Sequence, residues 1–175
     1  MDTKYEFSNQ DLKKLIVPLM IEQALAITVG MMDTVMVSFL GDAAVSGVSL
    51  VDMINVLIIN IFAALATGGA VVASQFIGAR QREKACKSAN QLLIVTFVIS
   101  AVIMAFALVF RSQLLLLLFG SIEADVMENA KRYFLITGLS YPFIAMYNSC
   151  AALFRAMGNS RISMFASTVV NLINI

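Results

Sequence analysis

Long apolar stretches alternate with short polar segments along almost the whole chain. The stretches fall at about residues 12–40, 44–77, 89–118, 125–154 and 162–175. About 20 consecutive apolar residues are enough for a helix to cross a bilayer, and each of the first four stretches is at least that long. The fifth is shorter and is still running at Ile175. The pattern predicts an all-α integral membrane protein, built as a bundle of about five transmembrane helices.

The polar segments between the stretches predict the connections. Residues 41–42 form a turn, residues 78–87 a basic loop or helical hairpin, residues 120–128 an acidic turn, and residues 155–161 a basic loop. Pro142 is expected to interrupt the fourth helix, because proline removes a backbone hydrogen bond. Residues 1–14 are polar and of mixed charge. They predict a short amphipathic segment at the membrane surface, with Ser8 or Asn9 as the N-cap.

Composition agrees with a membrane protein and argues against several function classes. Of the 175 residues, 60% are hydrophobic and 13% are charged, whereas about 25% are charged in a typical soluble domain. The net charge of +1 offers no basic surface to nucleic acid. The chain contains no histidine and no Walker A, HExxH or GxSxG motif. We therefore expect no enzymatic activity, no cofactor and no bound metal, and any proton chemistry must use carboxylates. Cys86 and Cys150 form no CxxC motif, and we interpret both as free thiols.

Basic residues predict the orientation in the bilayer. If the chain crosses at each apolar stretch, the N-terminus and residues 78–88 and 155–161 lie on one side. Nine of the twelve Lys and Arg residues belong to these segments: Lys4, Lys13, Lys14, Arg80, Arg82, Lys84, Lys87, Arg155 and Arg161. The positive-inside rule places this side in the cytoplasm. We expect a multi-pass protein of the plasma membrane with a cytoplasmic N-terminus. A nucleotide or lipid-headgroup site is the alternative interpretation of these residues, but topology alone is sufficient.

Two carboxylates interrupt the first apolar stretch. Glu22 and Asp33 are eleven residues apart, about three helical turns, so both lie on nearly the same face of one helix. A charge in hydrocarbon is costly, and an acid within a transmembrane segment indicates a functional site. Two acids on a face shielded from lipid suit a proton or cation relay, with Glu22 as a possible second acid beside Asp33. The alternative is structural: hydrogen bonds between helices hold both side chains, or Glu22 reaches the interface by snorkelling.

Other polar residues add candidates for the same cavity. Asn171 and Asn174 share one face of the last helix. An Asn carbonyl near an Asp carboxylate supplies the hard oxygen atoms that suit Na⁺ or a proton site. Flexible Met side chains either bind varied apolar ligands or simply fill the membrane interior. The candidates for a substrate cavity are Gln23, Met36, Asn55 and Asn60, although many polar residues in such helices only join one helix to another.

Four segments together resemble a known family of transporters. They are MMDTVMVSFLG at residues 31–41, ATGGAVVASQFIGARQREKA at 66–85, RYFLITGLSYPF at 132–143 and LFRAMGNSRISMFASTVVNLINI at 153–175. Their order and spacing resemble the N-terminal half of multidrug and toxic compound extrusion (MATE) transporters, and the resemblance covers nearly the whole chain.

The resemblance implies twelve helices in two six-helix lobes, and export of amphipathic, often cationic drugs by alternating access, coupled to H⁺ or Na⁺. Residues 1–175 then correspond to a partial N-terminal lobe, without the sixth helix and the C-terminal lobe. In the family's N-lobe site a first-helix Asp meets polar residues of the fifth helix. Asp33 matches that Asp, Asn174 matches a fifth-helix Asn, and Pro18 matches the proline where the first helix can bend. The expected partners are small-molecule drugs or toxic organic cations, the lipid bilayer and the missing C-terminal lobe.

Two other functions also fit this architecture. A small structural or interaction subunit of a membrane complex would use its acids only to lock the helix bundle. A flippase for lipid-linked sugars shares the lobe architecture, but a cavity for pyrophosphate-linked substrates needs Arg and Lys. The charges in the middle of these stretches are acids, which favours cationic substrates or ions.

Overall fold

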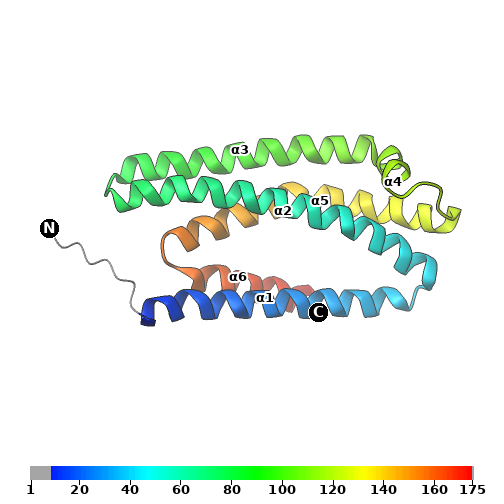
Figure 1. The fold of residues 1–175 in the computed structure, drawn as a ribbon, viewed down its shortest axis with the longest axis horizontal. Helices are drawn as coiled ribbons and strands as arrows, with labels where there is room; N and C mark the ends of the chain where they lie inside the picture. Colours follow the sequence, from blue (N-terminus) through cyan, green and yellow to red (C-terminus); the bar gives the residue numbers. More distant parts are fainter. Residues whose placement is uncertain (1–8, 175) are drawn as a thin grey trace.

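The computed structural model describes residues 9–174, which form six helices joined by short connections (Figure 1). The helices are α1 (Asn9–Ser38), α2 (Asp42–Gly78), α3 (Arg82–Val109), α4 (Arg111–Phe119), α5 (Ala124–Ala156) and α6 (Ser160–Asn174). The all-α fold class is therefore confirmed. Ser8 and most of the expected amphipathic segment lie outside the described residues.

Two groups of helices make up the molecule. Helices α2, α3 and α5 pack closely against one another, and α1 packs mainly against α6. Figure 1 shows the α1–α6 pair as a separate layer beside the three-helix bundle. Contacts between the two groups are fewer, and they run from α1 to α2 and from α5 to α6.

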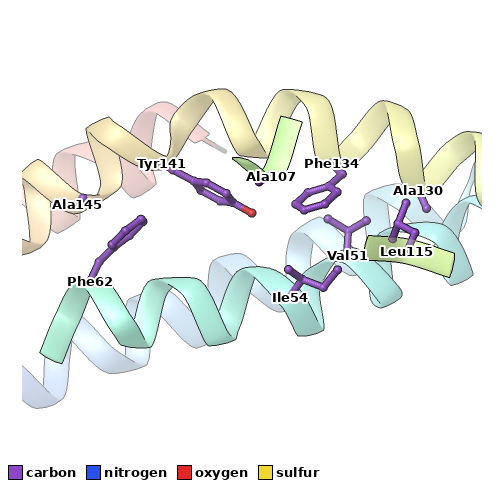
Figure 2. Close-up of a cluster of buried hydrophobic side chains, with 9 residues drawn as sticks. All are labelled: Val51, Ile54, Phe62, Ala107, Leu115, Ala130, Phe134, Tyr141 and Ala145. Carbon is purple, nitrogen blue, oxygen red and sulfur yellow. The ribbon is translucent and has the colours of Figure 1, made fainter. Parts of the chain in front are cut away.

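The hydrophobic core lies inside the three-helix bundle. Its buried members come from α2, α3, α4 and α5: Val51, Ile54, Phe62, Ala107, Leu115, Ala130, Phe134, Tyr141 and Ala145. Figure 2 shows Phe62 on α2 and Tyr141 on α5 approaching each other, with ring centroids 6.1 Å apart in an edge-on arrangement. Gly47 brings the backbones of α2 and α5 together, because a Cβ atom there would lie 2.9 Å from the Ala130 nitrogen. Helix packing in membranes favours small residues for this reason.

The α1–α6 pair buries small polar residues on its α6 side. On α6, Ser160, Ser163 and Ser167 are buried, at a spacing that puts them on one face. The large apolar side chains of α1, among them Met20, Ile27 and Met31, are mostly exposed. An exposed apolar surface of this kind on a helix of membrane-spanning length is suited to lipid or to further protein.

Three described helices are long and apolar enough to cross a membrane: residues Leu15–Ser38 of α1, Asp42–Gly78 and Arg82–Val109. The start of α1, the α2–α3 connection and the α5–α6 connection lie at one end of the molecule, and α4 lies at the other (Figure 1). We call the first of these the basic end, because it carries Arg80, Arg82, Lys84, Lys87, Arg155 and Arg161.

The structure corrects two expected helices. The expected helix 89–118 is two helices, and the first begins earlier, so part of the expected basic loop is the first turns of α3. The chain changes direction at Phe110, and α4 thereby brings Leu115 into the core, where it is fully buried. The bundle of about five helices thus has a sixth, short one among the described residues.

Pro142 was expected to interrupt the fourth helix. Instead, α5 is one helix of 33 residues, and Pro142 lies inside it. Proline costs one backbone hydrogen bond, and membrane helices tolerate this where neighbouring groups compensate. Pro142 is buried against the neighbouring helices. α5 has its main contacts with α2 and α3.

Candidate functional site

A cavity of about 460 Å³ opens between α1, α2 and α5, toward the end of the molecule opposite the basic end. We call it the carboxylate cavity, because Asp33 from α1 and Asp52 from α2 both line it, with Tyr133 from α5. The remaining lining residues are Gly30, Thr34, Met36, Val37, Val45, Val48 and Ser49. Two acids in an otherwise largely apolar cavity are a strong indication of a cation or proton site.

Helical periodicity places these residues together. On α1, residues 30, 33, 34 and 37 follow the spacing i, i+3, i+4, i+7, and residues 45, 48, 49 and 52 repeat that spacing on α2. Residues at this spacing share one face of a helix. The Thr34 hydroxyl donates to the Gly30 carbonyl 2.9 Å away, so its hydrogen bond stays within α1.

Asp52 is held by a network of hydrogen bonds inside the bundle. The Tyr133 hydroxyl donates to Asp52 Oδ1 at 3.0 Å, and Asn55 Nδ2 donates to the same oxygen at 3.3 Å. The Tyr141 hydroxyl donates to Asn55 Oδ1 at 2.8 Å. Asn55 and Tyr141 are buried, so the network fixes Asp52 against α5 and stabilises its carboxylate.

Asp33 lines the same cavity, but its exposure and its hydrogen bonding differ from those of Asp52. It lies on the exposed side of the loosely packed helix α1. Among the side chains that the structure describes, none donates a hydrogen bond to its carboxylate and no Lys or Arg forms an ion pair with it. Asp52 Oδ1, in contrast, accepts two hydrogen bonds.

Glu22 belongs to a second polar cluster, nearer the basic end, which joins three helices. The Tyr147 hydroxyl from α5 donates to Glu22 Oε1 at 3.4 Å, and the Ser163 hydroxyl from α6 donates to Oε2 at 3.3 Å. Arg155 Nη1 lies 3.8 Å from Oε1. The Glu22 side chain is only 12% exposed. The structure thus places Glu22 in hydrogen bonds between helices, and it does not bring Glu22 and Asp33 into one site.

The other expected residues divide between the cavity and the surface. Met36 lines the carboxylate cavity, and Asn55 lies behind it in the hydrogen-bond network. Gln23 and Asn60 are exposed and are not among the lining residues. Pro18 is buried inside α1, which continues through it as one helix.

The two asparagines expected to accompany Asp33 lie on α6. Asn171 is half-buried, and its Nδ2 atom is buried without a hydrogen-bond partner among the described residues. A direct hydrogen bond from Asn171 to Asp33 is therefore absent in this structure. Asn174 is the last residue of α6, and its side chain lies outside what the structure describes. Pairing of Asn174 with Asp33 stays a prediction.

Asp52 and Tyr133 were not among the predicted site residues. Asp52 lies within the second apolar stretch, directly before its charge-free part. Its spacing of three from Asn55 was an available signal, because the two share a helix face. Tyr133 lies 81 residues away from its partner, and nothing local in the sequence connects them.

Comparison with models of known protein families identifies the family of this chain. The MatE model matches residues 18–175. The chain belongs to the MatE family. The helices of membrane-spanning length and the family together support a membrane location.

Individual MatE relatives agree with this membership. The chain is 33% identical over 159 residues to the Bacillus subtilis protein named "Uncharacterized transporter YisQ", covering 90% of this chain and 34% of that protein. It is 28% identical over 169 residues to the Thermotoga maritima "Probable multidrug resistance protein NorM", covering 95% of this chain and 35% of that protein. A solved transporter of the MOP superfamily from Pyrococcus furiosus has the same fold, with a TM-score of 0.86 at 23% identity over 93% of this chain and 35% of that chain. This MatE chain spans about a third of the length of these relatives.

Proposed function

We propose that this chain is the N-terminal part of a cation-coupled antiporter, which exports amphipathic cationic drugs by alternating access, and that Asp33 binds the coupling H⁺ or Na⁺. The observation that carries the proposal is the contrast within the carboxylate cavity. Asp52 has two hydrogen-bond donors, whereas Asp33 has none among the described residues. A carboxylate without a partner in a cavity of this kind is suited to exchange one cation for another.

The register of α1 and α6 supports a role for Asn174. Both helices run from the basic end toward the other end (Figure 1). Glu22 and Ser163 mark one level of this pair, because they are hydrogen-bonded. Eleven residues further along, about 16 Å at 1.5 Å per residue, the two helices reach Asp33 and Asn174. An Asn oxygen at this level is a candidate second ligand for a cation bound by Asp33.

The loose packing of α1 supports alternating access. Helix α1 touches the three-helix bundle much less than it touches α6, and Pro18 removes the backbone hydrogen bond to the carbonyl of residue 14. A helix with these two properties can bend or shift at low cost. Neutralisation of Asp33 favours closer packing of α1, and a charged Asp33 favours a cation or a cationic drug in the cavity. Proton and drug then stabilise different states, as exchange requires.

The charges of the cavity also separate this proposal from a lipid-linked sugar flippase. The carboxylate cavity is lined by two acids and by no Lys or Arg. A substrate that carries a pyrophosphate would be repelled there, and Arg or Lys would be needed to bind it. The similarity to the T. maritima relative named as a multidrug resistance protein agrees with drug export. We place the protein in the plasma membrane with the basic end in the cytoplasm, following the positive-inside rule.

Replacement of Asp33 tests the proposal. In cells that express the natural-length protein, Asp33→Asn keeps the shape of the side chain but removes its charge and its titration. We expect it to abolish export of ethidium, an amphipathic cation, under imposed proton and sodium gradients. The matched control is Asp42→Asn, because Asp42 is exposed at the start of α2 and does not line the cavity. Export at the parental rate by Asp33→Asn, at equal expression, would show that Asp33 is structural.

A further inference from the structure

A second cavity, of about 410 Å³, lies at the basic end between the ends of α2, α3 and α5. We call it the basic-end cavity. It is lined by Ala73, Ile77, Arg80, Arg82, Ala85, Cys86, Ala89, Leu153 and Met157. None of these residues lines the carboxylate cavity, which contacts the opposite half of α2. The volume falls in the range of about 300–1,000 Å³ that is typical of small-molecule sites.

The walls of the basic-end cavity are apolar and its rim is positive. Alanines form much of the wall, with Ile77, Leu153 and Met157 beside them. The charged lining residues are both arginines, Arg80 and Arg82. An apolar wall favours a hydrocarbon group, and the planar guanidinium group of Arg is well suited to bidentate contacts with phosphate. The chemistry matches an amphipathic anion.

The backbone at Arg80 points to a role for its side chain. Arg80 has φ of 57°, and it is the single non-glycine residue with positive φ among the described residues. It ends α2 in a turn in which Arg80 N–H donates to the Ile77 carbonyl at 3.0 Å and Gln81 N–H donates to the Phe76 carbonyl at 2.9 Å. Glycine is the usual residue at such a left-handed position after a helix. Arginine there holds the backbone in a costly conformation, and strain of this kind is a sign of function.

The surroundings of the rim add positive charge. Lys84 and Lys87 follow on the first turns of α3 and are exposed, and Glu83 is the only acid within residues 79–90. Both α2 and α3 are of membrane-spanning length and composition, so their connection is expected near one surface of the membrane, with the apolar wall formed by the last turns of α2, the first turns of α3 and the end of α5. A net positive cluster at this level attracts anionic lipid headgroups.

We propose that the basic-end cavity binds an anionic phospholipid of the surrounding bilayer, with the headgroup phosphate on Arg80 and Arg82 and the first part of an acyl chain against Ala73, Ala85 and Leu153. The inference does not depend on drug export or on Asp33. The proposed orientation puts this site in the cytoplasmic leaflet, where anionic lipids contribute a negative surface potential.

The test measures lipid retention by the purified natural-length protein, using native mass spectrometry and titration with dioleoyl phosphatidylglycerol. The parental protein should retain phosphatidylglycerol at least about tenfold more tightly than dioleoyl phosphatidylcholine. Arg80→Gln with Arg82→Gln should weaken phosphatidylglycerol binding by about tenfold or more, because the loss of one charge-assisted hydrogen bond lowers affinity by at least about tenfold. The matched control, Lys84→Gln with Lys87→Gln, removes the same charge but no lining residue and should change binding by less than about threefold.

Two further variants separate binding from folding. Arg80→Gly removes the guanidinium group while favouring the left-handed backbone. It should therefore weaken lipid binding with an unchanged or higher melting temperature. Ala89→Phe fills the cavity without a change in charge and should also lose the lipid.

Three results would overturn the site. Equal losses from the Arg pair and the Lys pair would mean diffuse attraction to the surface. Equal retention of phosphatidylcholine would mean that the headgroup charge is not recognised. Competition by soluble glycerol 3-phosphate as strong as that of the lipid would indicate a free-phosphate site.

Discussion

The three-helix bundle of α2, α3 and α5 differs from the α1–α6 pair in its packing and in the residues that it buries. The bundle contains the apolar core, with Phe62, Phe134 and Tyr141 almost fully buried. The pair has serines at its interface and leaves its large apolar side chains exposed. The bundle is therefore tightly packed, whereas α1 has fewer contacts with it. The two acids of the carboxylate cavity follow this division, since Asp52 belongs to the tightly packed part, which we expect to be rigid, and Asp33 to the loosely packed part, which we expect to be mobile.

The largest expected effect comes from the core of the bundle. Phe134 is 1% exposed and packs in the cluster shown in Figure 2. Phe134→Ala should cost roughly 3 kcal/mol, the lower end of the range for buried Phe→Ala, because the cavity term persists even where lipid replaces water. Met36→Ala on α1 should change stability by less than about 0.5 kcal/mol, because Met36 is 65% exposed. Thermal unfolding in detergent measures both, and equal losses would contradict the division into a rigid and a mobile region.

Two glycines give a sharper comparison. A Cβ at Gly47 would meet backbone atoms of α5 at 2.9 and 3.0 Å, whereas a Cβ at Gly30 on α1 would meet nothing within 4 Å. Gly47→Ala should destabilise by about 1–3 kcal/mol, because the helices must separate. Gly30→Ala should stabilise by up to about 1 kcal/mol through helix propensity. A tolerated Gly47→Ala would mean that the α2–α5 contact is not close packed.

The apolar pattern was sufficient to predict most helices to within a few residues, because a membrane-spanning helix needs only length and hydrophobicity. The break at Phe110 coincides with a short polar interruption, Arg111–Gln113, inside the expected helix 89–118. Hydrophobicity alone left open whether one helix continues through this interruption, and in the fold the segment after it buries Leu115 in the core. The continuity of α5 through Pro142, which is buried in the fold, was likewise not predicted.

The site was predictable where it depends on one helix and not where it depends on several. Residues 33 and 37 share one helix face by their spacing of four, and both line the carboxylate cavity. The partners of Glu22 come from α5 and α6, with Tyr147 125 residues away in the sequence. No single-helix argument identifies such partners. The fold places Glu22 in hydrogen bonds between helices, and its role as a second relay acid stays a prediction.

Glu22 offers a way to loosen α1 further. Glu22→Gln keeps the size of the side chain but weakens the hydrogen bonds from Tyr147 and Ser163. We expect a loss of about 1–2 kcal/mol, within the range for hydrogen bonds to a charged group. The ion pair itself should contribute less than about 1 kcal/mol, because Arg155 is 32% exposed and 3.8 Å away. A double-mutant cycle with Arg155→Gln measures that part, and a coupling above about 2 kcal/mol would show that the ion pair dominates.

The smallest expected effect distinguishes the two acids of the cavity. Tyr133→Phe removes the 3.0 Å hydrogen bond to Asp52 and leaves the 3.3 Å bond from Asn55 in place. One such bond to a partly exposed acceptor is worth about 1 kcal/mol, and a ring without its hydroxyl still fills the same space on α5. Asp33 lacks a hydrogen bond to Tyr133 and should keep its cation affinity. Export of ethidium by Tyr133→Phe should therefore stay within about threefold of the parental rate, a change of less than about 1 kcal/mol, while Asp33→Asn abolishes it. If Tyr133→Phe and Asp33→Asn lose export equally, the two acids act as one unit, and the division between a fixed and an exchangeable carboxylate is wrong.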